Sequence, residues 1–157
     1  MASLSKKENQ PIYILHTYPF KETSLIVEIL SKEYGRIAFT AKGARRPRSS
    51  LRGMLLPFQS LQATWSGRQE LKTLHNIEWS NAFLTIEGDA LVCGFYLNEL
   101  IMRLVPKDDP YPKLYDFYNN TIQELTSNKF LSVTLRRFEL RLLQELGYQV
   151  PLNKDTH

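Results

Sequence analysis

Cysteine and histidine are scarce in this chain of 157 residues, and their scarcity excludes several kinds of site. The single cysteine, Cys93, cannot form a disulfide framework or a thiolate-rich zinc site within the chain. The three histidines, His16, His75 and His157, are too few and too widely spaced to suggest a metal cage. We therefore predict that the chain holds no metal and needs no cofactor.

Long apolar runs are also missing. No stretch of about 18 apolar residues occurs, which is the length that a membrane-spanning helix requires. The first ten residues, MASLSKKENQ, lack the apolar stretch of a signal peptide, and we interpret residues 1–10 as a flexible arm. The sequence predicts a soluble protein of a reducing, cytoplasmic compartment with no membrane partner.

Motifs for catalysis are absent as well. The phosphate-binding pattern GxxxxGK[ST] does not occur. Two acidic pairs, Glu87 with Asp89 and Asp108 with Asp109, are more typical of helix starts than of a metal site. Cys93 lies on an apolar helical stripe, where a cysteine is more often a core residue than a nucleophile. We predict no catalytic residue and no enzymatic activity.

Acidic residues are missing from the middle of the chain. None occurs between Arg36 and Gln69, whereas the whole chain carries a net charge of +4. Residues 32–72 contain nine basic and two acidic residues, a net charge of +7, and residues 73–157 have a net charge of −3. Such segregation of charge is the electrostatic footprint of a protein that binds a polyanion.

The first half of the chain has the two-residue periodicity of strands. Five strands are predicted in a domain over residues 11–80, at residues 12–18, 24–30, 36–42, 56–65 and 69–79. In the third, RIAFTAK alternates, which predicts Ile37, Phe39 and Ala41 on the inner face and Arg36, Ala38, Thr40 and Lys42 on the solvent face. Five such strands favour an OB-type barrel, although an open meander or an SH3-like barrel also fits.

The second half has the periodicity of amphipathic helices, and residues 81–157 are predicted to form an all-α domain. Three apolar stripes predict three helices with these stripes facing inward. The first stripe is Cys93, Leu97, Leu100, Ile101 and Leu104, the second is Leu114, Tyr118, Thr121, Ile122 and Leu125, and the third is Leu131, Leu135, Phe138, Leu142 and Leu146. The predicted fold class is therefore a β barrel followed by helices.

A basic loop between Gly43 and Gly53 is the main candidate site. Together with the residue before it, the loop places five cations within eleven residues: Lys42, Arg45, Arg46, Arg48 and Arg52. Their ammonium and guanidinium groups suit phosphate oxygens. Three further cations, Arg36, Arg68 and Lys72, extend this patch if neighbouring strands bring them together. The alternative interpretation is an ordinary solvated loop.

Platforms for stacking bases are few. The outward residues of the clearest strand, Ala38 and Thr40, are small, while Phe39 is expected in the core. Tyr18 and Phe20 either stack on bases or cover the core. We therefore expect binding that is dominated by the phosphate backbone, tolerant of sequence and sensitive to salt.

A second candidate surface lies on the third predicted helix, where Arg136, Arg137 and Arg141 flank the apolar stripe. These arginines suit an acidic peptide whose apolar end enters between helices. The alternative is a solvated helix face on which they pair with Glu139, Glu145 or other acids.

The order and spacing of five segments are similar to those of a known bacterial family. The main three are AKGARRPRSSLRGMLLPF at residues 41–58, YLNELIMRLVPKDDPYP at 96–112 and LRRFELRLLQELGY at 135–148. Two shorter ones are YPFKETSL at 18–25 and GRQELKTL at 67–74. Together they resemble the RecO recombination-mediator and DNA-repair proteins.

The resemblance implies an OB-fold domain, a helical domain and a non-enzymatic function. RecO proteins bind single- and double-stranded DNA, anneal complementary strands, and act with RecR to help RecA replace single-stranded DNA-binding protein, whose acidic C-terminal tail they also contact. By resemblance, the DNA-binding residues are Arg36, Lys42, Arg45, Arg46, Arg48 and Arg52, and the tail-binding residues are Arg136, Arg137 and Arg141. The implied location is the bacterial cytoplasm, in association with the nucleoid.

The chain departs from the family pattern at its C-terminal end. RecO proteins usually continue well past the LGY segment, with further helices and often a cysteine cluster for zinc. We therefore expect an incomplete helical domain with an apolar helix face left uncovered, which favours self-association. Two other functions fit the residues: a protein-interaction adaptor with incidental DNA contact, and an OB-type RNA-binding module.

Overall fold

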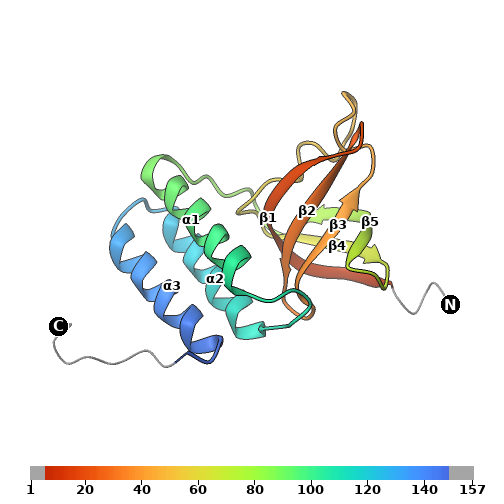
Figure 1. Cartoon of the computed structure of the whole chain (residues 1–157). Helices are drawn as coiled ribbons and strands as arrows, with labels where there is room; N and C mark the ends of the chain where they lie inside the picture. The colour runs from red at the N-terminus through yellow and green to blue at the C-terminus, as the bar shows by residue number, and fades with distance from the viewer. Residues whose placement is uncertain (1–5, 149–157) are drawn as a thin grey trace.

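A computed structural model describes residues 6–148 as a closed barrel of five strands packed against three helices (Figure 1). The strands are β1 (Lys7–Phe20), β2 (Ser24–Ser31), β3 (Gly35–Ala41), β4 (Leu61–Ser66) and β5 (Leu71–Trp79). Their order around the barrel is β1-β2-β3-β5-β4, with β3 and β5 parallel and the other pairs antiparallel. Closure in this order confirms the OB-type barrel and excludes the open meander.

The barrel core contains the predicted inner face of the third strand. Ile37, Phe39 and Ala41 are buried there together with Trp65 of β4. The first strand is longer than predicted, because Lys7 pairs with Trp65 at the start of β1. The interpretation of the N-terminus as a flexible arm is therefore wrong for residues 7–10, and residues 1–5 lie outside the described part of the chain.

The predicted strand at residues 56–65 is too long, because β4 begins only at Leu61. Phe58 interrupts the extended backbone with a φ of 69° and buries its ring beneath α1 (Gly88–Leu104). A Cβ atom added at Gly94 of this helix would lie 2.8 Å from the Phe58 ring. Glycine at this position lets α1 pack directly on the segment that leads into β4.

The helices α1, α2 (Pro112–Leu125) and α3 (Leu131–Glu145) occur where the apolar stripes predict them. All five stripe residues of α2 are buried, which confirms the second stripe. In α1, Leu97 and Ile101 are buried as predicted, but Leu104 is 37% exposed. In α3, Phe138 and Leu142 are buried, whereas three members of the third stripe are only partly buried: Leu131, Leu135 and Leu146. These three leucines pack against the edge of the helical core but are not covered completely.

One apolar core joins the barrel to the helices. Tyr13, Leu15 and Leu30 belong to barrel strands but pack in the same cluster as the helical core. The buried Asn98 of α1 donates a hydrogen bond to the backbone oxygen of Leu15, 3.2 Å away, and accepts one from the hydroxyl of Tyr118. These contacts fix α1 against β1, so the barrel and the helices form a single packed body.

The segment between α1 and α2 runs beside β3. Lys107 forms a parallel bridge with Arg36, and the backbone N–H of Asp108 donates to the Arg36 oxygen at 2.9 Å. Gly35 has a φ of 76° and touches the backbone of Asp109, so no side chain fits at its position. None of the helices within residues 6–148 has the length and hydropathy needed to cross a membrane.

Candidate nucleic-acid interface

A cleft of about 480 Å³ opens where the β1–β2 turn, the end of β3 and the start of β5 meet. Four cations line it: Lys21, Lys42, Arg46 and Lys72. Four hydroxyl side chains line it as well: Thr23, Ser24, Thr40 and Thr73. Because no carboxylate is among these lining residues, the cleft has a positive potential and several neutral donors, a combination that suits phosphate oxygens.

Strand pairing explains why residues far apart in the sequence share this cleft. Parallel β3 and β5 place Thr40 opposite Thr73, which brings Lys72 to the same edge as Lys42. Lys72 and Lys42 therefore line one cleft, and the binding role expected of this patch stays a prediction. Lys72 is only partly available, because its ammonium group donates to the Gln69 oxygen and lies 4.0 Å from the carboxylate of Asp108.

Lys21 also lines the cleft, although it is not among the site residues predicted from the sequence. It lies in the turn between β1 and β2 with a φ of 54°, and its ammonium group sits 5.2 Å from the centre of the Phe20 ring. Phe20 itself lines the cleft, so it is the aromatic side chain best placed to meet a base there. The sequence pattern predicts two strands joined by a turn, but it does not predict the turn geometry that brings Lys21 to the cleft beside β3.

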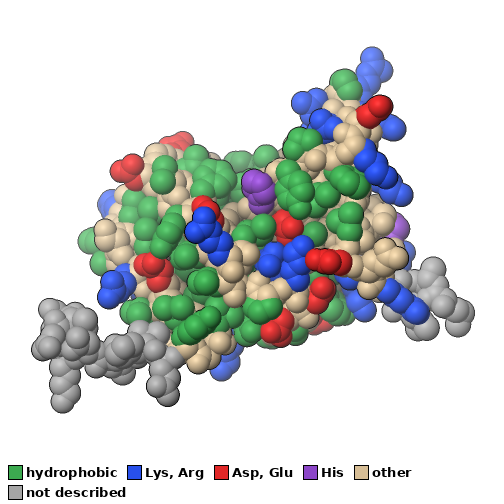
Figure 2. Space-filling view, in the orientation of Figure 1, with side chains coloured by type: hydrophobic (Ala, Val, Ile, Leu, Met, Phe, Trp, Pro, Cys, Tyr) green, Lys and Arg blue, Asp and Glu red, His purple; other side chains and the backbone are tan. Residues whose placement is uncertain are grey.

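The basic loop is a compact element that projects from the barrel (Figure 1). Consecutive turns shape it: the Ser49 N–H donates to the Arg46 oxygen at 3.0 Å, and the Met54 N–H donates to the Leu51 oxygen at 3.0 Å. At its two ends Ala44 and Leu55 are buried in the barrel core. Figure 2 shows Lys and Arg side chains gathered along this projection. The loop is therefore anchored at both ends and presents its cations to solvent.

Arg46, Arg48 and Arg52 are exposed, and their guanidinium groups have no hydrogen-bonding or ion-pair partner among the described residues. Arg45 differs from them, because its guanidinium donates to three backbone oxygens of the β1–β2 turn, those of Lys21, Glu22 and Ser24 at 2.7, 2.7 and 3.0 Å. The Arg45 side chain thus ties the loop to the barrel, and three of its five N–H donors are already used.

The expectation that Arg36 lies on the solvent face is wrong. Its side chain is buried, with Nε donating to the Val105 oxygen at 2.9 Å and Nη1 lying 3.3 Å from the carboxylate of Glu28. Lys107 approaches the other oxygen of this carboxylate at 3.8 Å. The physical reason is that the segment after α1 covers this part of β3, so Arg36 stands at the junction of barrel and helices rather than in the cleft.

Two other predicted residues are placed as follows. Arg68 is exposed in the turn between β4 and β5 and does not line the cleft. Tyr18 is 37% exposed, and its hydroxyl lies 3.3 Å from the Glu28 carboxylate. Burial first, and then the negative charge of Glu28, raise the pKa of Tyr18. Tyr18 is therefore held at the junction, and Phe39 is fully buried as predicted.

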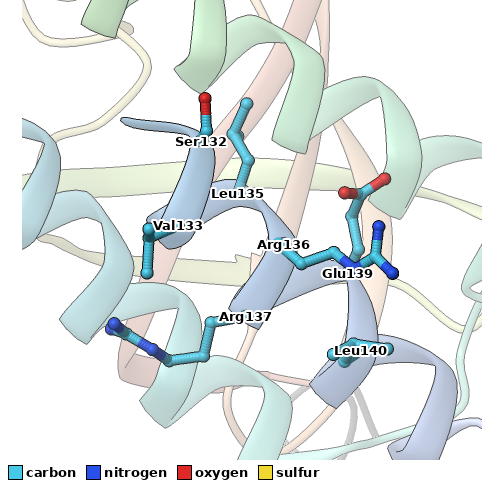
Figure 3. Close-up of a pocket in the computed structure, with 7 residues that line it drawn as sticks. All are labelled: Ser132, Val133, Leu135, Arg136, Arg137, Glu139 and Leu140. Atoms are coloured by element: carbon cyan, nitrogen blue, oxygen red, sulfur yellow. The ribbon is translucent and has the colours of Figure 1, made fainter. Parts of the chain in front are cut away.

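The second candidate surface is a groove of about 750 Å³ along α3 (Figure 3). Its lining combines apolar and charged side chains: Ser132, Val133, Leu135, Arg136, Arg137, Glu139 and Leu140. Arg137 is paired with Glu124 of α2 at 2.8 Å, and Arg141 lies over the Phe117 ring, 4.8 Å from its centre. Figure 3 shows Arg136 and Arg137 extending in different directions. Within the described residues, Arg137 is the one of the three predicted arginines that has a hydrogen-bond or ion-pair partner, whereas Arg136 and Arg141 keep their N–H donors free.

Metal-binding geometry does not arise in the part of the chain that the structure describes. No group of three or more His, Cys, Asp or Glu side chains within it is arranged to hold an ion. Cys93 is partly buried against the helical core, and burial raises the pKa of its thiol. The chemistry available at both candidate surfaces is binding through charge and hydrogen bonds.

A closed OB-type barrel with a cation-lined cleft, continued by a helical bundle, defines the class to which this protein belongs, that of OB-barrel proteins with an added helical domain. Comparison with known families makes the assignment specific. The family model described as "Recombination protein O N terminal" matches residues 5–83, and the model described as "Recombination protein O C terminal" matches residues 87–157. The chain belongs to the RecO family.

Individual relatives agree with this assignment. "DNA repair protein RecO" of Chromobacterium violaceum is 49% identical over 156 residues, which cover 99% of this chain and 64% of the relative. The protein of the same name from Nitrosospira multiformis is 49% identical over 151 residues, 96% of this chain and 62% of the relative. The chain thus spans somewhat less than two thirds of the length of these curated relatives.

Proposed function

We propose that the chain binds single- and double-stranded DNA through the phosphate backbone, at the cleft and the basic loop. The observation that supports this proposal is the set of four cations around the cleft, whose lining includes no carboxylate. Phosphates that replace condensed counterions at such a surface gain affinity from ion release, and this gain does not depend on base sequence. The single aromatic lining residue, Phe20, adds little sequence readout.

The wider role that we propose is that of a strand-annealing recombination mediator in DNA repair, which acts by binding rather than by catalysis. In this role the protein works with RecR to help RecA load on DNA coated with single-stranded DNA-binding protein, in the bacterial cytoplasm at the nucleoid. Membership of the RecO family supports the proposal, as does the name DNA repair protein RecO that the relatives carry.

Replacement of cleft cations tests the DNA-binding proposal. The double variant Lys42→Ala/Arg46→Ala is expected to bind a single-stranded oligonucleotide about tenfold to a hundredfold more weakly at moderate salt. The slope of log affinity against log salt is negative, and its magnitude should decrease by about 1.4, because two phosphate contacts are lost. The matched control is Lys113→Ala/Lys129→Ala, which removes two exposed cations from the helical half. Equal effects in the two variants would contradict a site at the cleft.

The same titrations separate DNA from RNA. DNA and RNA strands of equal length are compared with the wild-type chain at equal salt. A clear preference for RNA would favour the alternative of an RNA-binding module. Unchanged affinity and salt slope in the cleft variant, together with intact partner binding, would favour the adaptor.

The groove on α3 supports a further proposed partner, the acidic C-terminal tail of single-stranded DNA-binding protein. Its apolar residues Val133, Leu135 and Leu140 suit the apolar end of a peptide, and the guanidinium of Arg136 suits a carboxylate. A labelled acidic tail peptide is expected to lose affinity severalfold in Arg136→Ala. Arg141→Ala serves as the control, since Arg141 lies over Phe117 and outside the groove lining. Equal losses in both variants would count against this site.

A further inference from the structure

The exposed cations of the basic loop fall into two groups that lie in different places. Arg46 lines the cleft, together with Lys21, Lys42 and Lys72. Arg48 and Arg52 are exposed farther along the loop and do not belong to the cleft lining. Figures 1 and 2 show the loop standing out from the barrel with cationic side chains along it. One molecule therefore offers a recessed cationic surface and a projecting one.

Arg45 holds the projecting surface at a set position relative to the cleft. Its guanidinium reaches three backbone oxygens of the β1–β2 turn, and its own N–H donates to the Thr23 oxygen at 2.8 Å. The planar fork of arginine makes these contacts possible at once, which a lysine ammonium cannot reproduce. Because Lys21 and Thr23 also line the cleft, the same turn that shapes the cleft carries the base of the loop.

The projecting surface is positive but not free of acid. Glu22 lies in the adjacent β1–β2 turn and is exposed. From Lys42 to Arg52 the loop itself contains five cations and no acidic residue. With Arg45 engaged by backbone oxygens and Arg46 in the cleft, Arg48 and Arg52 remain as exposed loop cations outside the cleft lining.

We propose that one molecule holds two DNA strands at once, the first along the cleft and the second on Arg48 and Arg52 of the basic loop. The inference rests on the proposed DNA binding and adds to it that the cleft cations and the two loop arginines bind different strands. Two strands repel each other through their phosphates, and cations placed between them lower that repulsion while leaving the bases free to pair. Arg45 acts as the positioning residue that sets the separation of the two strands.

Two strands that cannot pair provide the test. The wild-type chain is mixed with two oligo-dT strands of equal length, one carrying a donor dye and the other an acceptor dye. Mass photometry gives the numbers of proteins and strands in each particle, and anisotropy gives the affinity for one strand alone. We expect energy transfer from particles with one protein and two strands.

Three variants locate the second strand. Arg48→Ala/Arg52→Ala is expected to lower energy transfer at least about tenfold while it weakens binding of a single strand less than about threefold. The control Lys113→Ala/Lys129→Ala should leave both readouts unchanged. Arg45→Lys keeps the charge but loses the three-oxygen fork, so energy transfer and annealing rate should fall while the salt slope for one strand stays the same.

The outcomes separate this inference from the proposed function. If the wild-type chain binds no single strand with salt-dependent affinity, the proposed DNA binding itself fails. If it binds one strand but gives no energy transfer, or only in particles that contain two proteins, the two-strand inference fails while DNA binding stands. Equal loss of single-strand affinity and energy transfer in Arg48→Ala/Arg52→Ala would also overturn it, since both groups of cations would then serve one strand.

Discussion

The buried pair of Arg36 and Glu28 yields a sharp prediction about stability. Glu28 is 3% exposed, and Arg36→Ala removes both the Nη1 contact to its carboxylate and the Nε hydrogen bond to the Val105 oxygen. Removing one member of a buried ion pair costs about 3–5 kcal/mol, because the other charge stays buried. Lys107 and Tyr18 still reach the Glu28 carboxylate, at 3.8 and 3.3 Å, so we expect a loss near the lower end, about 3 kcal/mol.

Urea denaturation followed by circular dichroism measures this loss as a shift of the unfolding midpoint at constant slope. The control is Arg103→Ala, which breaks the exposed pair with Glu99, whose N–O distance of 2.7 Å is shorter than that of the buried pair. That exposed pair contributes only about 0.3–0.5 kcal/mol. An Arg36→Ala loss no larger than the Arg103→Ala loss would refute the reasoning that burial decides the effect.

The same variant decides what Arg36 does for function. Under conditions in which Arg36→Ala is folded, it should bind single-stranded DNA with the salt slope of the wild-type chain, because the buried guanidinium meets no phosphate. A double variant, Arg36→Met/Glu28→Gln, should recover part of the lost stability, since neither buried position then holds an uncompensated charge. If the magnitude of the salt slope of Arg36→Ala is smaller than that of the wild-type chain by about 0.7 or more, Arg36 belongs to the DNA site after all.

Two further predictions concern packing and pH. Gly94→Ala places a Cβ atom against the Phe58 ring and should lower the free energy of unfolding by about 1–3 kcal/mol, which thermal denaturation will show; no change would mean that Phe58 can move freely. Burial raises the pKa of Tyr13 to about 12 and that of Tyr118 well above its usual value. The unfolded chain loses these protons near pH 10, so the free energy of unfolding should fall as pH rises from about 10 toward 12. Urea titrations across this range should show a weaker fall in Tyr13→Phe.

Periodicity predicted much of the fold because it reports which residues face a core. The alternation of RIAFTAK predicted that Ile37 and Phe39 lie inside the barrel, and all five residues of the apolar stripe predicted for α2 are buried in the structure. The same alternation gave a wrong prediction of solvent exposure for Arg36, because periodicity assigns a residue to the opposite face of a strand but does not show whether another segment covers that face. The covering segment around Val105 and Lys107 lies some seventy residues later in the chain, and only the tertiary structure brings it there.

The candidate site shows the same limit in another form. Composition identified the basic loop, and the absence of acids around it was visible in the sequence. The position of Lys21 depends on a turn geometry with positive φ, and the use of Arg45 depends on three backbone oxygens that have no sequence signature. The charge of a side chain follows from the sequence, whereas the backbone oxygens that accept its hydrogen bonds are known only from the structure.

Arginines of one charge run therefore divide by what surrounds them. Arg36 is held by a buried carboxylate and Arg45 by backbone oxygens, so a change at either residue acts first on the structure. Arg48 and Arg52 face solvent, so a change at either is expected to leave the structure intact and to act on the proposed DNA binding. A replacement of the whole run would mix structural and DNA-binding effects, since losing the Arg45 side chain alone removes three hydrogen bonds that hold the loop against the β1–β2 turn. Only variants that keep Arg36 and Arg45 measure the contribution of phosphate contacts.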